Sequence, residues 1–324
     1  MKKLLFIDHS YHAKTRATAF LQELLAAHFE LEVLWDESWN GGPAPSAPEL
    51  NAKRPDAIVF FQLLPEHRTL RSLDCPNITW VPMRDGLRYR SKKVRRLNAS
   101  GIKVLNFCAE AHAFFLSRKQ ETLRVQYWPA PELLPRPPVQ ARPRIFFWPR
   151  LNVISWNTLK TLLGNFRPQG IVLRYALDPG NEISLPSQED IAEYNITVLQ
   201  GWLGHDVYLA KLRECDIFMA PRPDEGIGQA MLEAMRNGLA VITPNAPTMN
   251  EYVQDGRSGW FYELANPAPL DFSHWAGRGD VALAQVASGH QTWLTQAPEI
   301  AAFVAKPPAN APNRYWKILK ALGY

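Results

Sequence analysis

The segment from Cys215 to Tyr262 constrains the fold of this 324-residue chain more than any other. It begins with an apolar run, Asp216 to Ala220, that predicts a buried strand, and a loop rich in Pro and Gly follows from Pro221 to Gly228. Apolar residues at helical spacing then predict a helix over Gln229 to Asn237, and Leu239 to Thr243 predicts a second buried strand. The segment is therefore a β-loop-α-β unit, as found in parallel α/β sheets.

Two glutamates lie eight residues apart in this unit, Glu225 in the loop and Glu233 within the helix. A helix N-terminus offers free backbone N–H groups and the positive end of a dipole, which suit a diphosphate. Glu233 would stand about 6 Å further along the axis, within reach of a ribose diol. Glu225 would then face whatever lies beyond the phosphates, although a loop glutamate before a helix is most often a solvated capping residue. The residues expected to line the phosphates are Gly226, Ile227, Gly228, Gln229 and Ala230.

Further residues extend this pattern in order and spacing. Glu225-Gly226-x-Gly228 is followed by Leu232 to Met235, by Gly238, and later by Glu251-x-Val253-x-x-Gly256. The arrangement resembles the donor-binding core of retaining glycosyltransferases of the GT-B fold, family 4 or group 1 type. The resemblance implies an α/β protein with two Rossmann-like, doubly wound domains that face each other across a cleft.

The same resemblance implies a function. The enzyme would transfer a sugar (hexosyl transfer) from a UDP- or GDP-sugar to a glycan or lipid-linked acceptor, with retention of anomeric configuration, in cell-surface polysaccharide or lipopolysaccharide assembly. Glu225 would bind hydroxyls of the donor sugar and Glu233 the ribose. The nucleotide-sugar is a co-substrate, and no cofactor or metal is expected, because the chain contains no Asp-x-Asp motif.

Other donor-site residues follow from the resemblance. Family members usually carry Gly-Arg-Leu after the first strand of the second domain, and a Lys five residues after the Arg. Arg150 occupies the place of the Arg and would neutralise the diphosphate, whereas Ser155 stands where the Lys is usual. Lys160 is near in sequence but belongs to the following helix. Trp202 and Leu203 match the segment that usually lines the nucleotide base, although a core tryptophan is the commoner outcome.

Length and composition predict two α/β domains of ordinary hydrophobic content. A proline-rich stretch from Tyr127 to Ala141 predicts the boundary between an N-terminal acceptor-binding domain, 1–135, and a donor-binding domain, 136–305. A strap and helix, 306–324, would cross back to the first domain. Three short helices are expected before this strap, near 280–287, 291–295 and 299–304.

The first domain carries the acceptor-side candidates. Its opening strand, Lys3 to Asp8, leads into a loop from Asp8 to Arg16 in which His9 or His12 would face the cleft. Family 4 members often have a Gly-Gly pair in this loop, and none is present here. Asp85 follows the strand Ile78 to Pro82 and is either a catalytic or acceptor-orienting acid or part of an ordinary Asp-Gly turn.

Charge distribution points to one further partner. The run Arg84 to Arg96 contains seven basic residues, which favour contact with an anionic membrane surface at ~1 kcal/mol per residue, although a solvated helix face is the usual explanation. No nucleic-acid-binding motif accompanies it. Cys75, Cys108 and Cys215 predict reduced core thiols, and no apolar run is long enough for a signal peptide or a membrane span. The expected location is cytoplasmic, peripheral to the inner face of the membrane.

Two alternatives stay open at this point. One is an inverting GT-B enzyme that uses Asp85 or His12 as a general base. The other is a non-catalytic module that binds a nucleotide-sugar or glycan, which the missing Lys at Ser155 and the missing Gly-Gly pair would favour.

Overall fold

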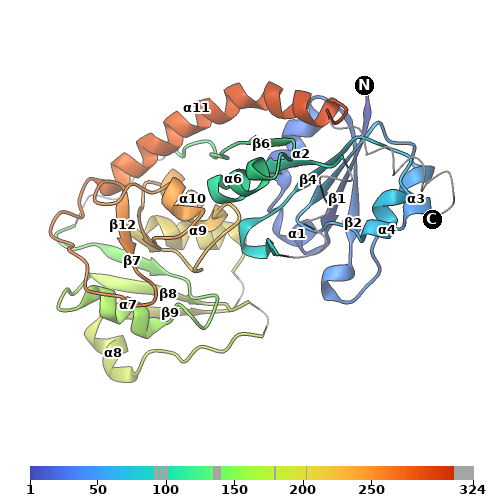
Figure 1. Ribbon diagram of the computed structural model, residues 1–324. Helices are drawn as coiled ribbons and strands as arrows, with labels where there is room; N and C mark the ends of the chain where they lie inside the picture. The colour runs from blue at the N-terminus through green and yellow to red at the C-terminus, as the bar shows by residue number, and fades with distance from the viewer. Residues whose placement is uncertain are drawn as a thin grey trace. The chain divides into compact units, whose positions relative to one another are not determined.

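The computed structural model describes residues 1–90, 94, 97, 101–133, 140–178, 180–201 and 203–309. Its contacts divide the chain into two compact units (Figure 1). The first unit consists of Met1–Gln126 together with the chain from Trp293 onward, and the second is Tyr127–Thr292. Both divisions fall earlier than the limits 135 and 305 that we predicted. The second does so because the ring of Trp293 packs against those of Phe20 and Phe107, with centroids 5.8 and 6.4 Å apart.

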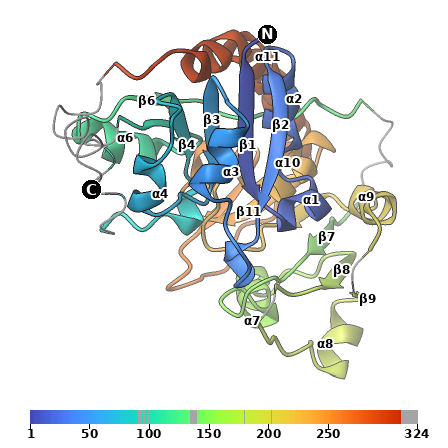
Figure 2. The same cartoon turned by 90° about the vertical axis from the view of Figure 1, so that its right-hand side faces the viewer.

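The first unit contains a six-stranded parallel sheet in the order β2-β1-β3-β4-β5-β6 (Figure 2). The chain runs outward from β1 to β2 and then returns to the other side with β3, so a topological switch point lies between β1 and β3. Every residue of β3, β4 and β5 is buried, as expected for inner strands of a parallel sheet. The strands are β1 (Lys3–His9), β2 (Glu30–Asp36), β3 (Ala57–Phe61), β4 (Ile78–Val81), β5 (Lys103–Asn106) and β6 (Thr122–Arg124).

Helices in this unit differ from the sequence prediction near the N-terminus. The loop expected from Asp8 to Arg16 contains the short helix α1 (Tyr11–Thr15), and a second helix, α2 (Ala19–Ala26), follows it. The reason is local, because Arg16 adopts a left-handed conformation with φ 55° and separates the two helices. The remaining elements are α3 (Ala47–Ala52), α4 (His67–Arg71), α6 (Ala109–Ser117) and the 3₁₀ turns η1 (Ser38–Asn40) and η2 (Arg84–Gly86).

The second unit also contains a six-stranded parallel sheet, in the order β9-β8-β7-β10-β11-β12. Numbered from β7, this is the Rossmann order 3-2-1-4-5-6, with its switch point between β7 and β10. The predicted β-loop-α-β unit is confirmed as β10, α10 and β11. The strands are β7 (Arg144–Phe147), β8 (Gly170–Tyr175), β9 (Ile196–Gln200), β10 (Ile217–Met219), β11 (Ala240–Pro244) and β12 (Gly259–Tyr262). The helical elements are α7 (Trp156–Leu163), α8 (Gln188–Glu193), α9 (His205–Arg213), α10 (Gln229–Arg236) and the 3₁₀ turn η4 (Met249–Glu251).

The three short helices expected after Asp280 form one continuous helix, α11 (Arg278–Ala305), with Pro298 inside it. Packing explains why the prediction was wrong. Gly289 looks like a helix breaker, but a Cβ at this position would lie 2.3 Å from the ring of Trp128, so glycine is what allows the tryptophan to approach. His290 Nδ1 lies 3.0 Å from the carbonyl oxygen of Trp128. Of the strap and helix predicted over 306–324, residues 310–324 lie outside the described residues.

The end of α11 is fixed by a buried cation on β5. Lys103 Nζ donates to the carbonyl oxygen of Val304 at 3.2 Å and to those of Phe303 and Lys306. A cation at a helix C-terminus meets the negative end of the helix dipole. Burial nevertheless lowers the pKa of Lys103 to about 8.

Two predictions about sequence class can be compared with the structure. The three cysteines are free and buried, as predicted. Among the described residues, no helix has both the length and the apolar character that a membrane crossing requires.

Candidate functional site

The predicted phosphate-binding residues gather at the switch point of the second sheet, where the carboxyl ends of β7 and β10 lie side by side. Arg150 follows β7, and its Nε and Nη2 atoms donate to Asp178 Oδ1 at 2.8 and 2.6 Å. Arg222 follows β10 and donates through Nη2 to the other oxygen, Oδ2, of the same carboxylate. Arg222 Nε also lies 3.8 Å from Glu225 Oε1. The structure therefore joins Arg150 to the Glu225 loop through Asp178, which the sequence prediction had missed.

The loop before α10 turns into the helix at a glycine and is held by backbone carbonyl contacts. Gly228 is the N-cap and adopts φ +83°, a left-handed conformation that favours glycine. Thr248 Oγ1 donates to the carbonyl oxygens of Glu225 and Gly226 at 2.6 and 3.1 Å, which fixes the loop. Ile227 is buried beneath it. The first turn of α10, with Gln229 and Ala230, thus starts at the same sheet edge as the two arginines.

Glu233 lies in the second turn of α10 and keeps 23% of its side chain exposed. Burial raises its pKa, while His205, Arg236 and Arg174 act in the opposite direction. Its Oε1 atom lies 3.7 Å from Nε2 of His205, an exposed residue at the start of α9. Glu233 is therefore accessible to a ligand, in surroundings that include a histidine the sequence prediction did not name.

A buried cation supports this side of the site. Arg174, near the end of β8, is only 3% exposed. Its guanidinium lies over the rings of Trp148 and Tyr208, 3.8 and 4.9 Å from their centroids. Arg150 lies over Trp148 as well, at 4.9 Å. The sequence could have indicated this residue, because it places an arginine inside an otherwise apolar strand. An arginine is rarely fully buried unless it has a partner.

The remaining donor-side predictions have mixed outcomes. Trp202 lies outside the described residues, so its expected contact with the base stays a prediction. Leu203 is half-buried and precedes α9. Ser155 is the N-cap of α7, and its backbone N–H donates to Thr158 Oγ1 at 3.3 Å. Lys160 is bound to Asp190 at 2.6 Å.

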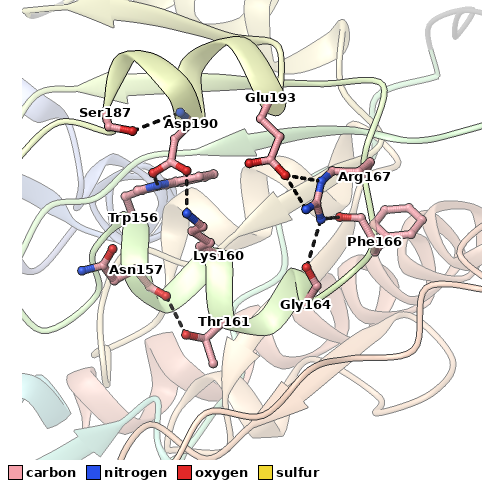
Figure 3. Close-up of polar contacts among 10 residues, drawn as sticks. All are labelled: Trp156, Asn157, Lys160, Thr161, Gly164, Phe166, Arg167, Ser187, Asp190 and Glu193. Atoms are coloured by element: carbon pink, nitrogen blue, oxygen red, sulfur yellow. Dashed lines mark hydrogen bonds and ion pairs between the residues drawn. The ribbon is translucent and has the colours of Figure 1, made fainter.

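A surface pocket of about 480 Å³ is lined by Lys160 of α7, Glu193 of α8 and Arg167, whose polar contacts Figure 3 shows. Its cations are paired, since Lys160 binds Asp190 and Arg167 Nε donates to Glu193 at 2.9 Å. Asp190 also accepts a bond from Trp156 Nε1 at 2.7 Å, as Figure 3 shows. Because these charges are paired, we interpret them as structural links from α7 and the chain after it to α8.

The acceptor-side candidates lie at the switch point of the first sheet. Asp8, fully buried on β1, has Oδ1 2.7 Å from His12 Nδ1 and accepts a bond from Thr18 Oγ1 on Oδ2, also at 2.7 Å. His9 Nε2 lies 3.1 Å from Oε1 of Gln62, which follows β3. The centroids of the His9 and His12 rings are 3.7 Å apart. The structure therefore brings both predicted histidines together at one sheet edge.

The bond to Asp8 assigns a chemistry to His12. A carboxylate accepts, so His12 Nδ1 carries the proton and Nε2 is left as the basic nitrogen. Burial lowers the pKa of His9, and the neighbouring His12 lowers it further. Asp8, His9 and His12 also have ligand atoms within 4.8 Å of one another, so this group could hold a divalent metal ion.

Asp85 lies in η2, after β4, and its Oδ1 accepts a bond from the N–H of Gly86 at 3.1 Å. That contact lies within the Asp85-Gly86 turn itself. The turn nevertheless belongs to the same sheet edge, because a Cβ on Gly86 would lie 3.5 Å from Gln62 Nε2. Of the basic run, Arg84 binds Glu110 at 2.9 Å and Arg88 and Arg90 are exposed, while Lys92, Lys93, Arg95 and Arg96 lie outside the described residues.

The chain is similar to known proteins in sequence and in fold. Residues 180–272 match the sequence model of the family described as "Glycosyl transferases group 1". A lipopolysaccharide outer core galactosyltransferase, WaaB, superimposes with a TM-score of 0.58 at 12% identity, over 98% of both chains. This is the GT-B fold.

Two other solved structures share it. A glycosyltransferase from Rickettsia africae has a TM-score of 0.60 at 12% identity, over 94% of this chain and 99% of that one. Anabaena HepE in complex with UDP and glucose has a TM-score of 0.50 at 15% identity, over 99% and 100%. No curated protein sequence matches this chain. The family match in the second unit and the GT-B fold together indicate a glycosyltransferase.

Proposed function

We propose that this protein transfers a sugar from a nucleoside-diphosphate sugar to a hydroxyl group of a glycan or lipid-linked acceptor. The observation that carries the proposal is the grouping at the second switch point, where Arg150, the start of α10 and the Glu225 loop meet. Most of these residues lie in the segment that matches the group 1 family, 180–272.

Each residue has a chemical role in this proposal. Arg150 and the amides of the first turn of α10 bind the diphosphate and stabilise the charge that develops on it as the sugar leaves. Glu225 binds hydroxyls of the donor sugar. Glu233, about one turn further along the helix, accepts hydrogen bonds from the ribose.

The proposal includes retention of anomeric configuration and a UDP- or GDP-sugar donor, both of which rest on the family resemblance. HepE, a structural neighbour, binds UDP and glucose, which makes UDP-glucose the first donor to test. A diphosphate held by an arginine and helix amides requires no bridging metal, so we propose metal-independent transfer. The resemblance also motivates a place in cell-surface polysaccharide or lipopolysaccharide assembly, at the cytoplasmic face of a membrane. Arg84, Arg88 and Arg90 would favour contact with anionic lipid there.

A screen of UDP-, GDP- and CMP-sugars by thermal shift, followed by calorimetric titration of the best ligand, tests the proposal. We expect one nucleoside-diphosphate sugar to raise the melting temperature and to be consumed when a suitable acceptor is added. If no nucleotide-sugar binds, the proposed function is wrong. Binding without transfer or hydrolysis across a panel of acceptors would instead identify a non-catalytic nucleotide-sugar module.

A second candidate is inverting transfer with His12 as the general base. The bond between Asp8 and His12, 2.7 Å long, favours it, because a buried carboxylate orients the imidazole and stabilises its protonated form. Asp85, bound within its own turn, is the weaker candidate for this role. Proton NMR of the first product separates the two mechanisms, since retention and inversion give opposite anomers from the same donor.

A further inference from the structure

In the candidate donor site, one of the two cations expected from the family resemblance is missing. Group 1 glycosyltransferases, which the sequence resembles, usually have a Lys five residues after the arginine, and Ser155 stands there in this chain. Ser155 is used as the N-cap of α7. A diphosphate carries at least two negative charges, so Arg150 alone leaves part of that charge to the helix amides.

Arg222 is the cation that is placed to supply this missing positive charge. It follows β10, the strand paired with β7 at the switch point, and it shares the carboxylate of Asp178 with Arg150. Its side chain is 23% exposed, close to the 19% of Arg150. The two guanidiniums are thus held by one carboxylate at one sheet edge, and both are accessible.

Two other cations in this unit fit less well. Lys160 lies one turn into α7 and is bound to Asp190 at 2.6 Å. Arg174 is only 3% exposed, with its guanidinium over the rings of Trp148 and Tyr208. Lys160 is therefore committed to a link between helices, and Arg174 is covered.

We propose that Arg222 is the second diphosphate-binding cation of this protein and that Asp178 positions it beside Arg150. The inference rests on the proposed function, since it assigns a ligand class, a nucleoside diphosphate, to the same site. A guanidinium has five N–H donors, so Arg222 can keep its bond to Asp178 while donating to a phosphate oxygen. Asp178 also prevents repulsion between the two arginines before the ligand binds.

Arg222 has a second consequence for the site. Its Nε atom lies 3.8 Å from Glu225 Oε1, three residues along the same loop. The cation that binds the phosphates is therefore adjacent to the carboxylate proposed to bind the sugar. Recognition of the diphosphate and positioning of Glu225 are coupled through this one side chain.

Calorimetric titration with UDP, GDP, ADP and CDP tests the inference, with the tightest binder then compared with its own monophosphate and nucleoside. Arg222→Gln is expected to weaken binding of the diphosphate about 10- to 100-fold and to leave the affinity for the nucleoside unchanged. Arg222→Lys should keep part of the affinity, because it preserves the charge but not the planar fork. A merely structural role would weaken all three ligands alike.

Arg167→Gln is the matched control. Arg167 is in the same unit and is paired with one carboxylate, Glu193, at a surface that no donor-site residue lines. This variant should bind the diphosphate as the wild type does, and thermal melting confirms that each variant is folded.

The outcomes separate the inference from the proposed function. If the wild type binds a nucleoside diphosphate and folded Arg222→Gln binds it equally well, or loses diphosphate and nucleoside affinity alike, the role of Arg222 is wrong and the function stands. If the wild type binds none of the four diphosphates, both are wrong.

Discussion

The chain at the ends of β1 and of β10 occupies equivalent places in two similar sheets, yet it carries different kinds of side chains. Each loop leaves an inner parallel strand at the switch point of its sheet. After β10 the chain presents Arg222 and Glu225 beside Arg150, all partly exposed. At the end of β1 a fully buried carboxylate, Asp8, is bonded to His12, which follows the strand.

The difference shows what each switch point is suited to bind. Paired arginines and helix amides stabilise a fixed negative charge, as on a diphosphate. An aspartate–histidine pair instead controls a proton, because the buried carboxylate fixes the tautomer of the imidazole. We therefore propose an anion site in the second unit and a proton-handling site in the first.

The largest expected effect is that of Glu225→Gln. If this carboxylate binds the donor sugar in the transition state, the variant should lower kcat about 100- to 1,000-fold while the affinity for the nucleoside diphosphate changes little. Steady-state kinetics and calorimetry measure the two quantities separately. Glu214→Gln, an exposed glutamate beside Lys211, is the control, and it should retain full activity. A Glu225→Gln enzyme with normal kcat would remove the sugar-binding role from this loop.

His12→Asn tests the opposite side of the comparison. If His12 acts as the general base, kcat should fall about 100-fold or more, with unchanged affinity for the nucleotide, because the side chain belongs to the first unit. A variant with wild-type kcat would leave Asp8 and His12 a structural pair and strengthen the retaining mechanism.

Glu233 gives a smaller effect that depends on pH. Glu233→Ala should weaken nucleotide binding about tenfold, by loss of the bonds to the ribose. Because burial raises the pKa of Glu233 above its usual 4.5, the wild-type affinity should fall as the pH is lowered through this raised value. The same shift makes the ligand-free protein relatively more stable below that range, and this gain is lost as the pH rises.

Titration of the nucleoside diphosphate at a series of pH values above the usual carboxyl pKa measures this dependence. Glu233→Gln provides the comparison, since it keeps the size of the side chain and cannot ionise. The part of the pH dependence that comes from Glu233 should be absent in this variant. Identical pH profiles for the wild type and Glu233→Gln, or full nucleotide affinity in Glu233→Ala, would contradict the ribose assignment.

The smallest expected effect is that of metal removal. Transfer should proceed at an unchanged rate after dialysis against a chelator, because the proposed diphosphate site consists of arginines and amides. The group of Asp8, His9 and His12 makes this measurement informative. A rate that falls on chelation and returns with Zn²⁺ would show that this group works through a metal ion rather than as a proton-handling pair.

The sequence predicted the β-loop-α-β unit well, because its strands are buried on both faces and its helix carries an apolar stripe, so local pattern and final environment agree. It failed at α11, which was expected as three short helices but is one continuous helix through Gly289 and Pro298. There the packing of Trp128 against Gly289 and the bonds of Lys103 at the helix end come from distant parts of the chain. Local propensity contains no information about such contacts.

For the site, the sequence by itself determined the residues that belong to one local motif. These are Glu225, Glu233 and the glycine-rich loop between β10 and α10. Only the tertiary structure decided which charged side chains pair with one another. Asp178 joins Arg150 to Arg222 through side chains that follow three different strands, and Asp8 on β1 binds His12 in α1. The physical reason is that a parallel sheet brings the carboxyl ends of its strands together, whereas their order in the sheet is not written in the spacing of residues along the chain.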